Sequence, residues 1–464
     1  MTVTHEIAVI GAGPGGYVAA IRAAQRGASV ALIEKDAMGG TCLNRGCIPS
    51  KTLITTARLY RQMRDAHRWG FSSSGISFKW ESIIARKDKV VSQLSRGIEY
   101  LLKKNKVTIY RGTARLDGAK RVLIESPLGN EAIGADRIIL ATGSLPGEIP
   151  LFPMNRRNIV TSDEALSWKE LPDSLLIVGA GVIGCEFAML FATFGVRVTL
   201  VEALPSVLAQ SSLDHEISGK IEALMKRKGI DLKLSARIDS LVPGGGNGLV
   251  TAKLEGGEEI VSEKALICVG RRPATENLGL EEAGIEMNRK KEVIVDQNLL
   301  TNVPDIYAIG DMNGKWQLAH VASFQGIRAA EAATGEPAAD EKTVVPWCIF
   351  TDPPAATVGL SEKEAAEKGI ETTVGKFPYR ALGKAVASGE TEGMVKLVAE
   401  KEKGTLLGAH LLGEGSPEMV HELAMAIHAG MSARDVMHMI HAHPTYSESI
   451  TEVCENIYGI GIHT

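Results

Sequence analysis

Near its N-terminus the chain contains the sequence Glu6-Ile-Ala-Val-Ile-Gly11-Ala-Gly-Pro-Gly-Gly16, an apolar run that leads into a glycine-rich turn. Residues 17–26 have a helical pattern, and a second apolar run over residues 28–33 ends at Glu34. This order predicts a strand, a turn, a helix and a strand. Such a unit binds a dinucleotide, because its glycines let the backbone close on a pyrophosphate and its carboxylate binds a ribose diol. The candidate glycines are Gly11, Gly13 and Gly16.

The same pattern returns at residues 174–202, where the turn is Gly179-Ala-Gly-Val-Ile-Gly184, a helical pattern covers residues 185–194 and the acidic residue is Glu202. One GxGxxG motif is weak evidence, but two copies, each after a strand and about 20 residues before an acidic residue, are strong. After each unit a further apolar strand leads into a glycine, at Gly143 and at Gly270. The sequence therefore predicts two Rossmann-like α/β domains. The second set of candidate glycines is Gly179, Gly181 and Gly184.

From about Thr343 the pattern changes to alternating strands and two helices, without a third nucleotide motif. A chain of 464 residues is long enough for several domains. We therefore expect a C-terminal α+β domain after the two dinucleotide-binding domains.

The composition argues against several classes of partner. The net charge is −4, so the chain has no basic footprint for nucleic acid or for an anionic membrane surface. No N-terminal segment resembles a signal peptide, and no apolar run is long enough to span a membrane. We expect a cytoplasmic protein that acts on a small molecule.

Two of the six cysteines, Cys42 and Cys47, lie close together in the sequence. Five residues of regular helix rise about 7.5 Å, whereas a disulfide needs Cα atoms within about 7 Å. Gly46 and Pro49 are placed to interrupt such a helix, and Pro49 also biases Ile48 away from α geometry. We therefore predict a bent or loop-like stretch from Cys42 to Cys47, with helix after it. The alternatives are two unrelated packed thiols or a metal site.

No metal site is expected. The cysteine pair has no CxxC spacing and no second pair to complete a tetrahedral site. His438, His441 and His443 are close in sequence, but no carboxylate or cysteine accompanies them at ligand spacing. The other cysteines have apolar neighbours and are interpreted as buried inert thiols: Cys185, Cys268, Cys348 and Cys454.

The segment around the cysteine pair, Gly39-Gly-Thr-Cys-Leu-Asn-Arg-Gly-Cys-Ile-Pro-Ser-Lys51, resembles the redox motif of the pyridine nucleotide-disulfide oxidoreductases. Its Ile48–Lys51 ending is more similar to dihydrolipoyl dehydrogenases than to glutathione reductases. The resemblance covers essentially the whole chain, including Ala141–Gly143, Val269–Pro273, Thr301–Asp311 and His441–Glu448.

The resemblance implies that the first unit binds FAD. Its glycines and Glu34 would hold the ADP half, and Asp311 would bind the ribityl chain. The alternative for Asp311 is a helix cap after Gly310. The other residues implied in FAD binding are Lys51, Thr142 and Gly143.

The second unit would bind NAD through its three glycines and Gly270. Glu202 favours NAD over NADP, because a carboxylate repels a 2′-phosphate. Ile183 matches the position that shields the flavin, with core packing as the alternative. Glu186 and Lys51 match a pair beside the flavin and the nicotinamide, with a surface ion pair as the alternative.

His443 precedes Pro444, which fixes an extended turn, and Thr445 and Glu448 have the spacing of a capping box. The resemblance implies that His443 is the acid–base residue, that Glu448 orients it, and that it reaches the disulfide of the other subunit. A homodimer follows from this. A histidine with the ordinary pKa of about 6.5 can take a proton from a thiol at neutral pH.

The resemblance thus implies an enzyme that oxidises protein-bound dihydrolipoamide and reduces NAD⁺. A dihydrolipoyl thiol deprotonated by His443 would attack Cys42, and Cys47 would pass electrons to the flavin. The partners would be lipoyl-bearing proteins of a 2-oxo acid dehydrogenase complex or the glycine cleavage carrier. The alternatives are a relative that acts on another disulfide, and a subunit whose main role is docking in a lipoyl complex. Mercury reduction is disfavoured because Cys454 stands alone near the C-terminus, and glutathione reduction is opposed by Glu202.

The implied domains are an FAD-binding domain over residues 1–145, an NAD-binding domain over 146–271, a central domain over 272–342 that completes the FAD site, and a C-terminal interface domain over 343–464.

Overall fold

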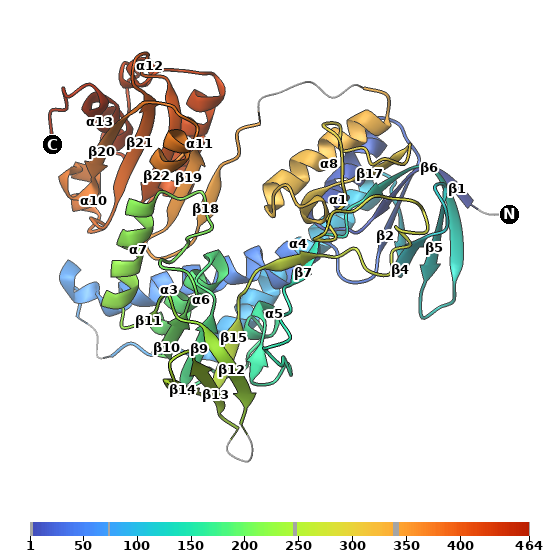
Figure 1. The fold of residues 1–464 in the computed structure, drawn as a ribbon, viewed down its shortest axis with the longest axis horizontal. Helices are drawn as coiled ribbons and strands as arrows, with labels where there is room; N and C mark the ends of the chain where they lie inside the picture. Colours follow the sequence, from blue (N-terminus) through green and yellow to red (C-terminus); the bar gives the residue numbers. More distant parts are fainter. Residues whose placement is uncertain (1–2, 73–74, 245–247, 337–342, 464) are drawn as a thin grey trace.

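The computed structural model describes residues 3–72, 75–244, 248–336 and 343–463. In it, the first glycine-rich unit forms the centre of a seven-stranded sheet (Figure 1). The strand order is β3-β2-β1-β6-β5-β4, and β17 pairs with β6. Strands β1, β2, β3, β6 and β17 are parallel, whereas β4 and β5 are antiparallel additions. Their bounds are β1 Val3–Ile10, β2 Val30–Glu34, β3 Thr108–Arg111, β4 Thr113–Leu116, β5 Arg121–Glu125, β6 Glu131–Leu140 and β17 Ile306–Ala308.

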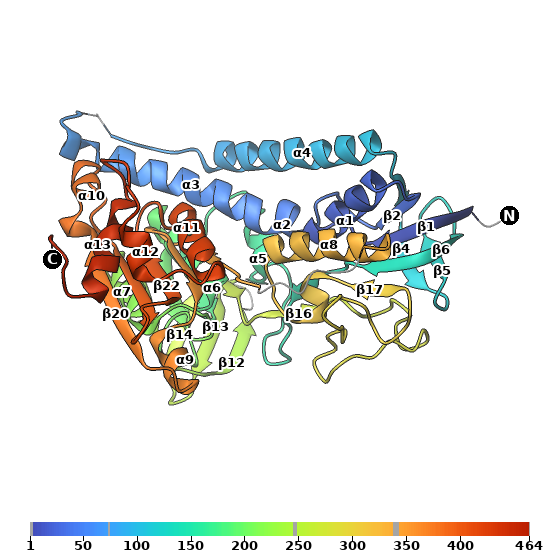
Figure 2. The ribbon, with the colours of Figure 1, turned by 90° about the horizontal axis from the view of Figure 1, so that it is seen from above.

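Three helices accompany this sheet: α1 (Pro14–Gln25), α4 (Trp80–Lys104) and α8 (Ala319–Ala333). Helix α8 packs along α1 although the two are far apart in sequence (Figure 2). Because β17 and α8 join the first sheet, residues 306–333 complete the first nucleotide unit. The last residues of the predicted central domain, 337–342, lie outside the described residues.

The second unit forms a parallel sheet of order β11-β10-β9-β15-β8, with a separate antiparallel sheet β12-β13-β14. The strands are β8 Ile159–Val160, β9 Ser174–Val178, β10 Arg197–Val201, β11 Asp231–Lys233, β12 Ile238–Pro243, β13 Val250–Leu254, β14 Glu259–Ser262 and β15 Lys264–Ile267. The helices of this part are α5 Ser162–Ala165, α6 Val182–Thr193 and α7 His215–Arg227.

Two short strands connect the first nucleotide unit to the second. Strand β7 (Ser144–Pro146) pairs antiparallel with β16 (Arg271–Pro273). The boundaries predicted after residues 145 and 271 fall inside these strands, so the chain enters and leaves the second unit side by side. The domain boundaries themselves stay a prediction.

The C-terminal part is an antiparallel sheet of order β18-β19-β22-β21-β20 with helices against it. The strands are β18 Trp347–Ile349, β19 Ala355–Gly359, β20 Thr372–Pro378, β21 Met394–Glu400 and β22 Leu406–Leu412. The helices are α9 Glu362–Glu367, α10 Gly383–Ala387, α11 Ser416–His428, α12 Ala433–Met437 and α13 Glu448–Ile457. The prediction of two helices accounts for α11 and α13, but it missed the three short ones, whose few residues carry no helical period.

Both nucleotide-unit helices begin earlier than predicted, at Pro14 and Val182 rather than at residues 17 and 185. The last glycine of each turn therefore lies inside the first helical turn. A Cβ at Gly16 would lie 1.8 Å from the Gly11 carbonyl oxygen, and a Cβ at Gly184 would lie 1.9 Å from that of Gly179. Only glycine allows this contact between turn and helix.

A buried charge network joins the second unit to the C-terminal sheet. Lys396 on β21 is 0% exposed, and its Nζ lies 2.8 Å from Asp214 Oδ1, at the N-cap of α7, and 2.6 Å from Glu362 Oε2. The backbone N–H of Asp214 also donates to Nδ1 of the buried His410. Burial raises the pKa of Asp214, but the Lys396 ammonium outweighs this and the pKa is lowered overall. Asp214 is therefore a buried carboxylate whose main cationic partner is Lys396, and it also accepts a hydrogen bond from the Glu216 backbone N–H at 2.9 Å.

Replacing Lys396 with methionine is expected to lower the stability of the protein by about 3 kcal/mol, because Asp214 would remain buried without a cation. Urea unfolding measures this. The control is Lys401→Met, which removes an exposed ion pair with Glu371 and should leave the urea midpoint unchanged. Equal midpoints for the two variants would contradict the expectation.

No helix in the described ranges is long and apolar enough to cross a membrane.

Candidate functional site

The cysteine pair lies where two helices meet. Helix α2 (Gly40–Arg45) carries Cys42, and α3 (Cys47–Arg64) begins at Cys47. Gly46 between them has φ −142° and ψ −112°, which interrupts the helix. The predicted break is therefore confirmed, but it is confined to one residue, and Cys42 lies in a helix rather than in a loop. Pro49 and Ile48 lie in the first turn of α3, where proline is tolerated, so Gly46 alone makes the break.

The two thiols interact directly. A hydrogen bond with the Cys42 thiol lowers the pKa of Cys47 to about 7; burial opposes the shift, and the Lys51 ammonium adds to it. The same hydrogen bond and burial raise the pKa of Cys42. Both cysteines are present as free thiols, Cys47 exposed and Cys42 half-buried. They form an asymmetric dithiol in which Cys47 ionises first, which argues against two unrelated packed thiols.

The other four cysteines ionise less readily than Cys47. Burial raises the pKa values of the thiols at all four positions, to about 12 at Cys268 and Cys454 and to about 11 at Cys348. A buried thiol that resists ionisation is a poor nucleophile. In the described residues no group of three histidine, cysteine or acidic side chains could hold a metal ion.

Lys51 and Glu186 form an ion pair one helical turn after Cys47. Lys51 Nζ lies 2.8 Å from Oε2 and 3.1 Å from Oε1 of Glu186. Glu186, on α6, is only 3% exposed, so the alternative of a surface pair is wrong. Burial lowers the pKa of Lys51, but Glu186 outweighs it and the pKa is raised overall. Because α6 begins with the second glycine turn, this pair connects the dithiol to the second nucleotide unit.

The two nucleotide turns have matching geometry. Glu34 accepts hydrogen bonds from the backbone N–H groups of Ala12 and Asp36 at 2.7 and 2.8 Å. Glu202 accepts from Ala180 and Leu204 at 2.7 and 2.9 Å. Each carboxylate is thereby fixed beside its own turn, and each retains lone pairs for a ribose diol.

Both turns fit a dinucleotide. Helices α1 and α6 have neither a capping side chain nor an acidic residue in the first turn, so their first N–H groups are free for a pyrophosphate. A Cβ placed on Gly13 or Gly181 would meet open space within 4 Å. Ile183, in the first turn of α6, is half-buried against the core of this unit. Its predicted shielding role stays a prediction.

Asp311 lies in the 3₁₀ turn η2 (Gly310–Asn313) and does not cap it. Its carboxylate accepts a hydrogen bond from Ser144 Oγ at 2.5 Å, and Arg271 donates to the same Oγ at 2.7 Å. Burial raises the pKa of Asp311, against the effect of Ser144. A buried carboxylate with spare acceptor capacity can bind hydroxyl groups such as those of a ribityl chain.

Hydrogen bonds from neighbouring residues fix the turn that carries Asp311. The side-chain oxygen of Gln325 accepts from Gly310 N–H at 2.7 Å and from Asn313 Nδ2 at 3.0 Å. Thr142 Oγ1 donates to the Ala274 carbonyl at 2.7 Å, and Gly143 and Gly270 have φ values of 70° and 106°. Sequence reasoning missed Ser144 as part of the site, because its partners Asp311 and Arg271 lie 167 and 127 residues away. It also missed Gln325, whose partners are only 15 and 12 residues away but belong to no recognisable motif.

His443 and Glu448 are paired as predicted. Glu448 Oε1 lies 2.8 Å from His443 Nδ1, and Oε2 accepts from Thr445 N–H at 2.7 Å. Glu448 therefore both orients the histidine and fixes the turn before α13. Only half of the predicted capping box forms, because Thr445 Oγ1 donates to the Ala442 carbonyl instead.

His443 is remote from the dithiol of its own chain. Its side chain is 78% exposed, and in the described residues no hydrogen bond or ion pair links it to Cys42 or Cys47. Figure 2 shows α2 near the middle of the molecule and α13 at the C-terminal end. The structure does not bring the two parts of the predicted site together within one subunit.

Comparisons with known proteins cover both the nucleotide-binding units and the C-terminal part of the chain. The family model described as pyridine nucleotide-disulphide oxidoreductase matches residues 5–326, and the model of its dimerisation domain matches residues 345–454. The chain is 39% identical to a dihydrolipoyl dehydrogenase of Bacillus subtilis, with 100% of both chains covered. It is 41% identical to that of Halobacterium salinarum, with 99% of this chain and 97% of the relative covered.

Solved structures are also similar. LpdA from Mycobacterium tuberculosis superimposes with a TM-score of 0.90 at 28% identity, covering 98% of this chain and 99% of the other. A Cu(II) complex of the HOCl-induced flavoprotein disulfide reductase RclA from Escherichia coli superimposes with a TM-score of 0.88 at 30% identity, with the same coverage.

Proposed function

The chain belongs to the pyridine nucleotide-disulphide oxidoreductase family, and from this membership and the site geometry we propose that it oxidises dihydrolipoamide to lipoamide with reduction of NAD⁺. The observation that carries the proposal is the asymmetric dithiol of Cys42 and Cys47 beside the Lys51–Glu186 pair. It is a flavoprotein oxidoreductase that uses FAD and NAD, as its full-length dihydrolipoyl dehydrogenase relatives indicate.

The chain's own residues carry out the thiol chemistry. With the Cys42–Cys47 disulfide formed, a substrate thiolate attacks Cys42 Sγ, the S–S bond breaks and the electron pair stays on Cys47. Because Cys47 has the lower pKa, it is the better leaving group. The second substrate thiol then displaces Cys42, which leaves lipoamide and the reduced pair.

His443 of the partner subunit supplies the base in this scheme. It accepts the protons of the substrate thiols, and Glu448 stabilises the charged imidazole and fixes its orientation. The remoteness of His443 from the dithiol of its own chain and the dimerisation domain both favour a homodimer.

The nucleotide turns hold the cofactors. The first turn, Glu34 and Asp311 would bind FAD, with Thr142 and Gly143 beside it, and the second turn, Glu202 and Gly270 would bind NAD. When bound, FAD would supply the two-electron redox chemistry that links the dithiol to NAD⁺. The domain assignment is an FAD-binding domain over residues 1–145, an NAD-binding domain over 146–271, a central domain over 272–342 and an interface domain over 343–464.

The physiological substrate in this proposal is a dihydrolipoyl group on a carrier protein, in a 2-oxo acid dehydrogenase complex or on the glycine cleavage carrier. The enzyme would act in the cytoplasm. The purified yellow protein tests the proposal in a steady-state assay of dihydrolipoamide, glutathione and Hg²⁺, each with NAD(H) and NADP(H). Fast turnover is expected with dihydrolipoamide and NAD⁺ alone. A colourless protein, or turnover confined to another substrate, would contradict it.

The choice of NAD gives a separate prediction. Glu202→Gln keeps a hydrogen-bonding side chain but removes the charge, so the preference for NAD over NADP, measured as the ratio of kcat/KM values, should fall about tenfold or more. The duplication supplies a matched control, Glu34→Gln, which makes the same change in the first unit and should leave the ratio unchanged. An unaltered ratio in Glu202→Gln would remove the assignment of this carboxylate.

A further inference from the structure

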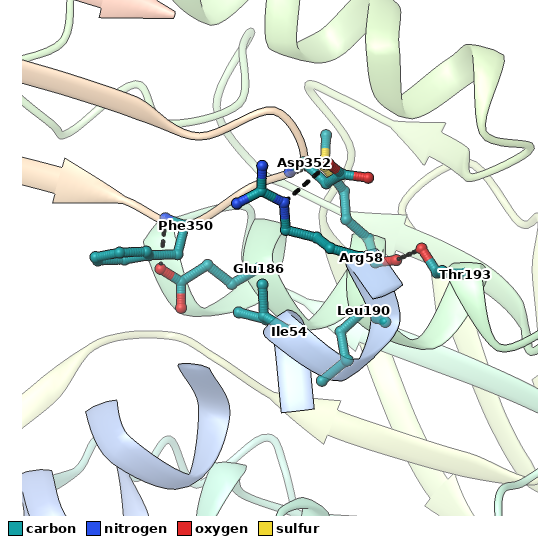
Figure 3. A pocket seen from close by; sticks show the side chains of 9 residues that line it. Ile54, Arg58, Glu186, Leu190, Thr193, Phe350 and Asp352 are labelled. Carbon is teal, nitrogen blue, oxygen red and sulfur yellow. Dashed lines mark hydrogen bonds and ion pairs between the residues drawn. The ribbon is translucent and has the colours of Figure 1, made fainter. Parts of the chain in front are cut away.

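Three distant parts of the chain meet at the Lys51–Glu186 pair. Lys51 comes from α3 and Glu186 from α6, and the third contributor is Phe350, directly after β18 in the C-terminal part. The backbone N–H of Phe350 donates to Glu186 Oε1 at 2.9 Å, and the Lys51 Nζ lies 4.7 Å from the centre of the Phe350 ring. Figure 3 shows the hydrogen bond between the Phe350 backbone and the Glu186 carboxylate.

The ring and the carboxylate hold the ammonium together. An ammonium over an aromatic face is attracted by the ring quadrupole, and the attraction grows as water is excluded. Lys51 is otherwise a long, flexible side chain that could turn away from the dithiol. The ring of Phe350 limits that movement, and the backbone N–H of Phe350 fixes Oε1, one of the two Glu186 oxygens that Lys51 binds.

The segment that carries Phe350 is itself anchored to α3. Asp352 is 8% exposed, and its Oδ2 lies 3.0 Å from Arg61 Nε and 2.9 Å from Lys228 Nζ. Arg58 Nε lies 3.6 Å from Oδ1 of the same carboxylate (Figure 3). The cavity lined by Arg58, Glu186, Phe350 and Asp352 has a volume of about 10 Å³, which is at the lower limit for one water molecule. The arrangement is therefore packed, and it is not a ligand site.

We propose that Phe350 is a positioning residue of the redox centre, which keeps the Lys51 ammonium and the Glu186 carboxylate in place beside the Cys42–Cys47 pair. The inference rests on the proposed role of this pair as the redox-active thiols. Phe350 would act through Lys51, and it would tie the C-terminal part of the chain to the chemistry at α3.

The proposal predicts a change in thiol ionisation. The groups that face Cys47 are Cys42 from α2, Lys51 from α3 and Glu186 from α6, and Lys51 also faces Cys348 of β18. Without the ring, Lys51 is free to turn away from the dithiol toward solvent. The Cys47 thiolate then loses the cation that stabilises it, and its pKa rises.

The experiment measures thiolate formation in the anaerobically reduced holoenzyme by ultraviolet absorbance as a function of pH, with the titration of a Cys47→Ser variant subtracted. In Phe350→Leu the midpoint is expected to rise by about 0.5 pH unit or more. Phe350→Tyr keeps the aromatic face and should restore the parent midpoint. The matched control is Phe71→Leu, which changes a phenylalanine that is 70% exposed and should leave the midpoint unchanged.

A midpoint in Phe350→Leu within about 0.2 pH unit of the parent overturns the proposal, and so does an equal shift in Phe71→Leu or in Phe350→Tyr. Should Phe350→Leu fail to fold, Phe350→Met, which also lacks the aromatic face, is measured in its place. The readout does not use dihydrolipoamide, so a protein inactive on that substrate can still support or overturn the role of Phe350.

Discussion

Cys47→Ser is expected to lower turnover of dihydrolipoamide by about 10⁴-fold or more, because the remaining thiol of Cys42 cannot form the internal disulfide that accepts two electrons. The same loss is expected for Cys42→Ser. The measurement is steady-state formation of NADH with dihydrolipoamide. Reduction of the flavin by NADH in a rapid-mixing experiment should persist in both variants, because that transfer does not pass through the sulfurs.

The matched control is Cys454→Ala. This thiol is 0% exposed in the C-terminal core, and burial raises its pKa, so its removal should leave turnover within about twofold of the parent. Substantial dihydrolipoamide turnover in Cys47→Ser would show that electrons reach the flavin without the cysteine pair.

The second large effect concerns His443. In His443→Ala, dihydrolipoamide turnover is expected to fall by about 10²- to 10⁴-fold, the usual contribution of a positioned acid–base group. Flavin reduction by NADH should remain near the parent rate, because it needs no base at the substrate thiol. Steady-state turnover and rapid mixing separate the two steps.

His438→Ala is the control for this variant, because it removes another exposed imidazole from the same turn region, and full activity is expected. The assignment of His443 as the base fails if its alanine variant keeps turnover within about tenfold of the parent. The two predictions together locate each half of the chemistry: the sulfurs on α2 and α3, and the base before α13.

Local patterns in the sequence predicted the nucleotide units well. The strand, turn, helix and acidic residue of each unit are in order, and the Glu34 and Glu202 carboxylates hold the same positions beside their turns. These features depend on contacts within about 35 residues. The interruption between Cys42 and Cys47 was also predictable, because it follows from the geometry of a disulfide and from one glycine.

Contacts between distant segments were not predictable in the same way. Phe350 and Asp352 lie in a segment with no recognisable motif. Their contacts are with residues of α3 and α6, which precede them by more than a hundred residues. The Lys396–Asp214 pair is a similar case, because a lysine in a strand usually faces solvent. Neither periodicity nor local spacing contains information on such partners.

The cations of α3 have a consequence for synthesis on the ribosome. Arg58 and Arg61 lie in the first seventh of the chain, yet their acidic partners Asp352, Glu390 and Glu414 belong to the last part. The first sheet also receives its last strand only when residues 306–308 emerge. The N-terminal domain of the nascent polypeptide therefore stays incomplete until about two thirds of the chain has been synthesised, and molecular chaperones have that interval in which to bind it.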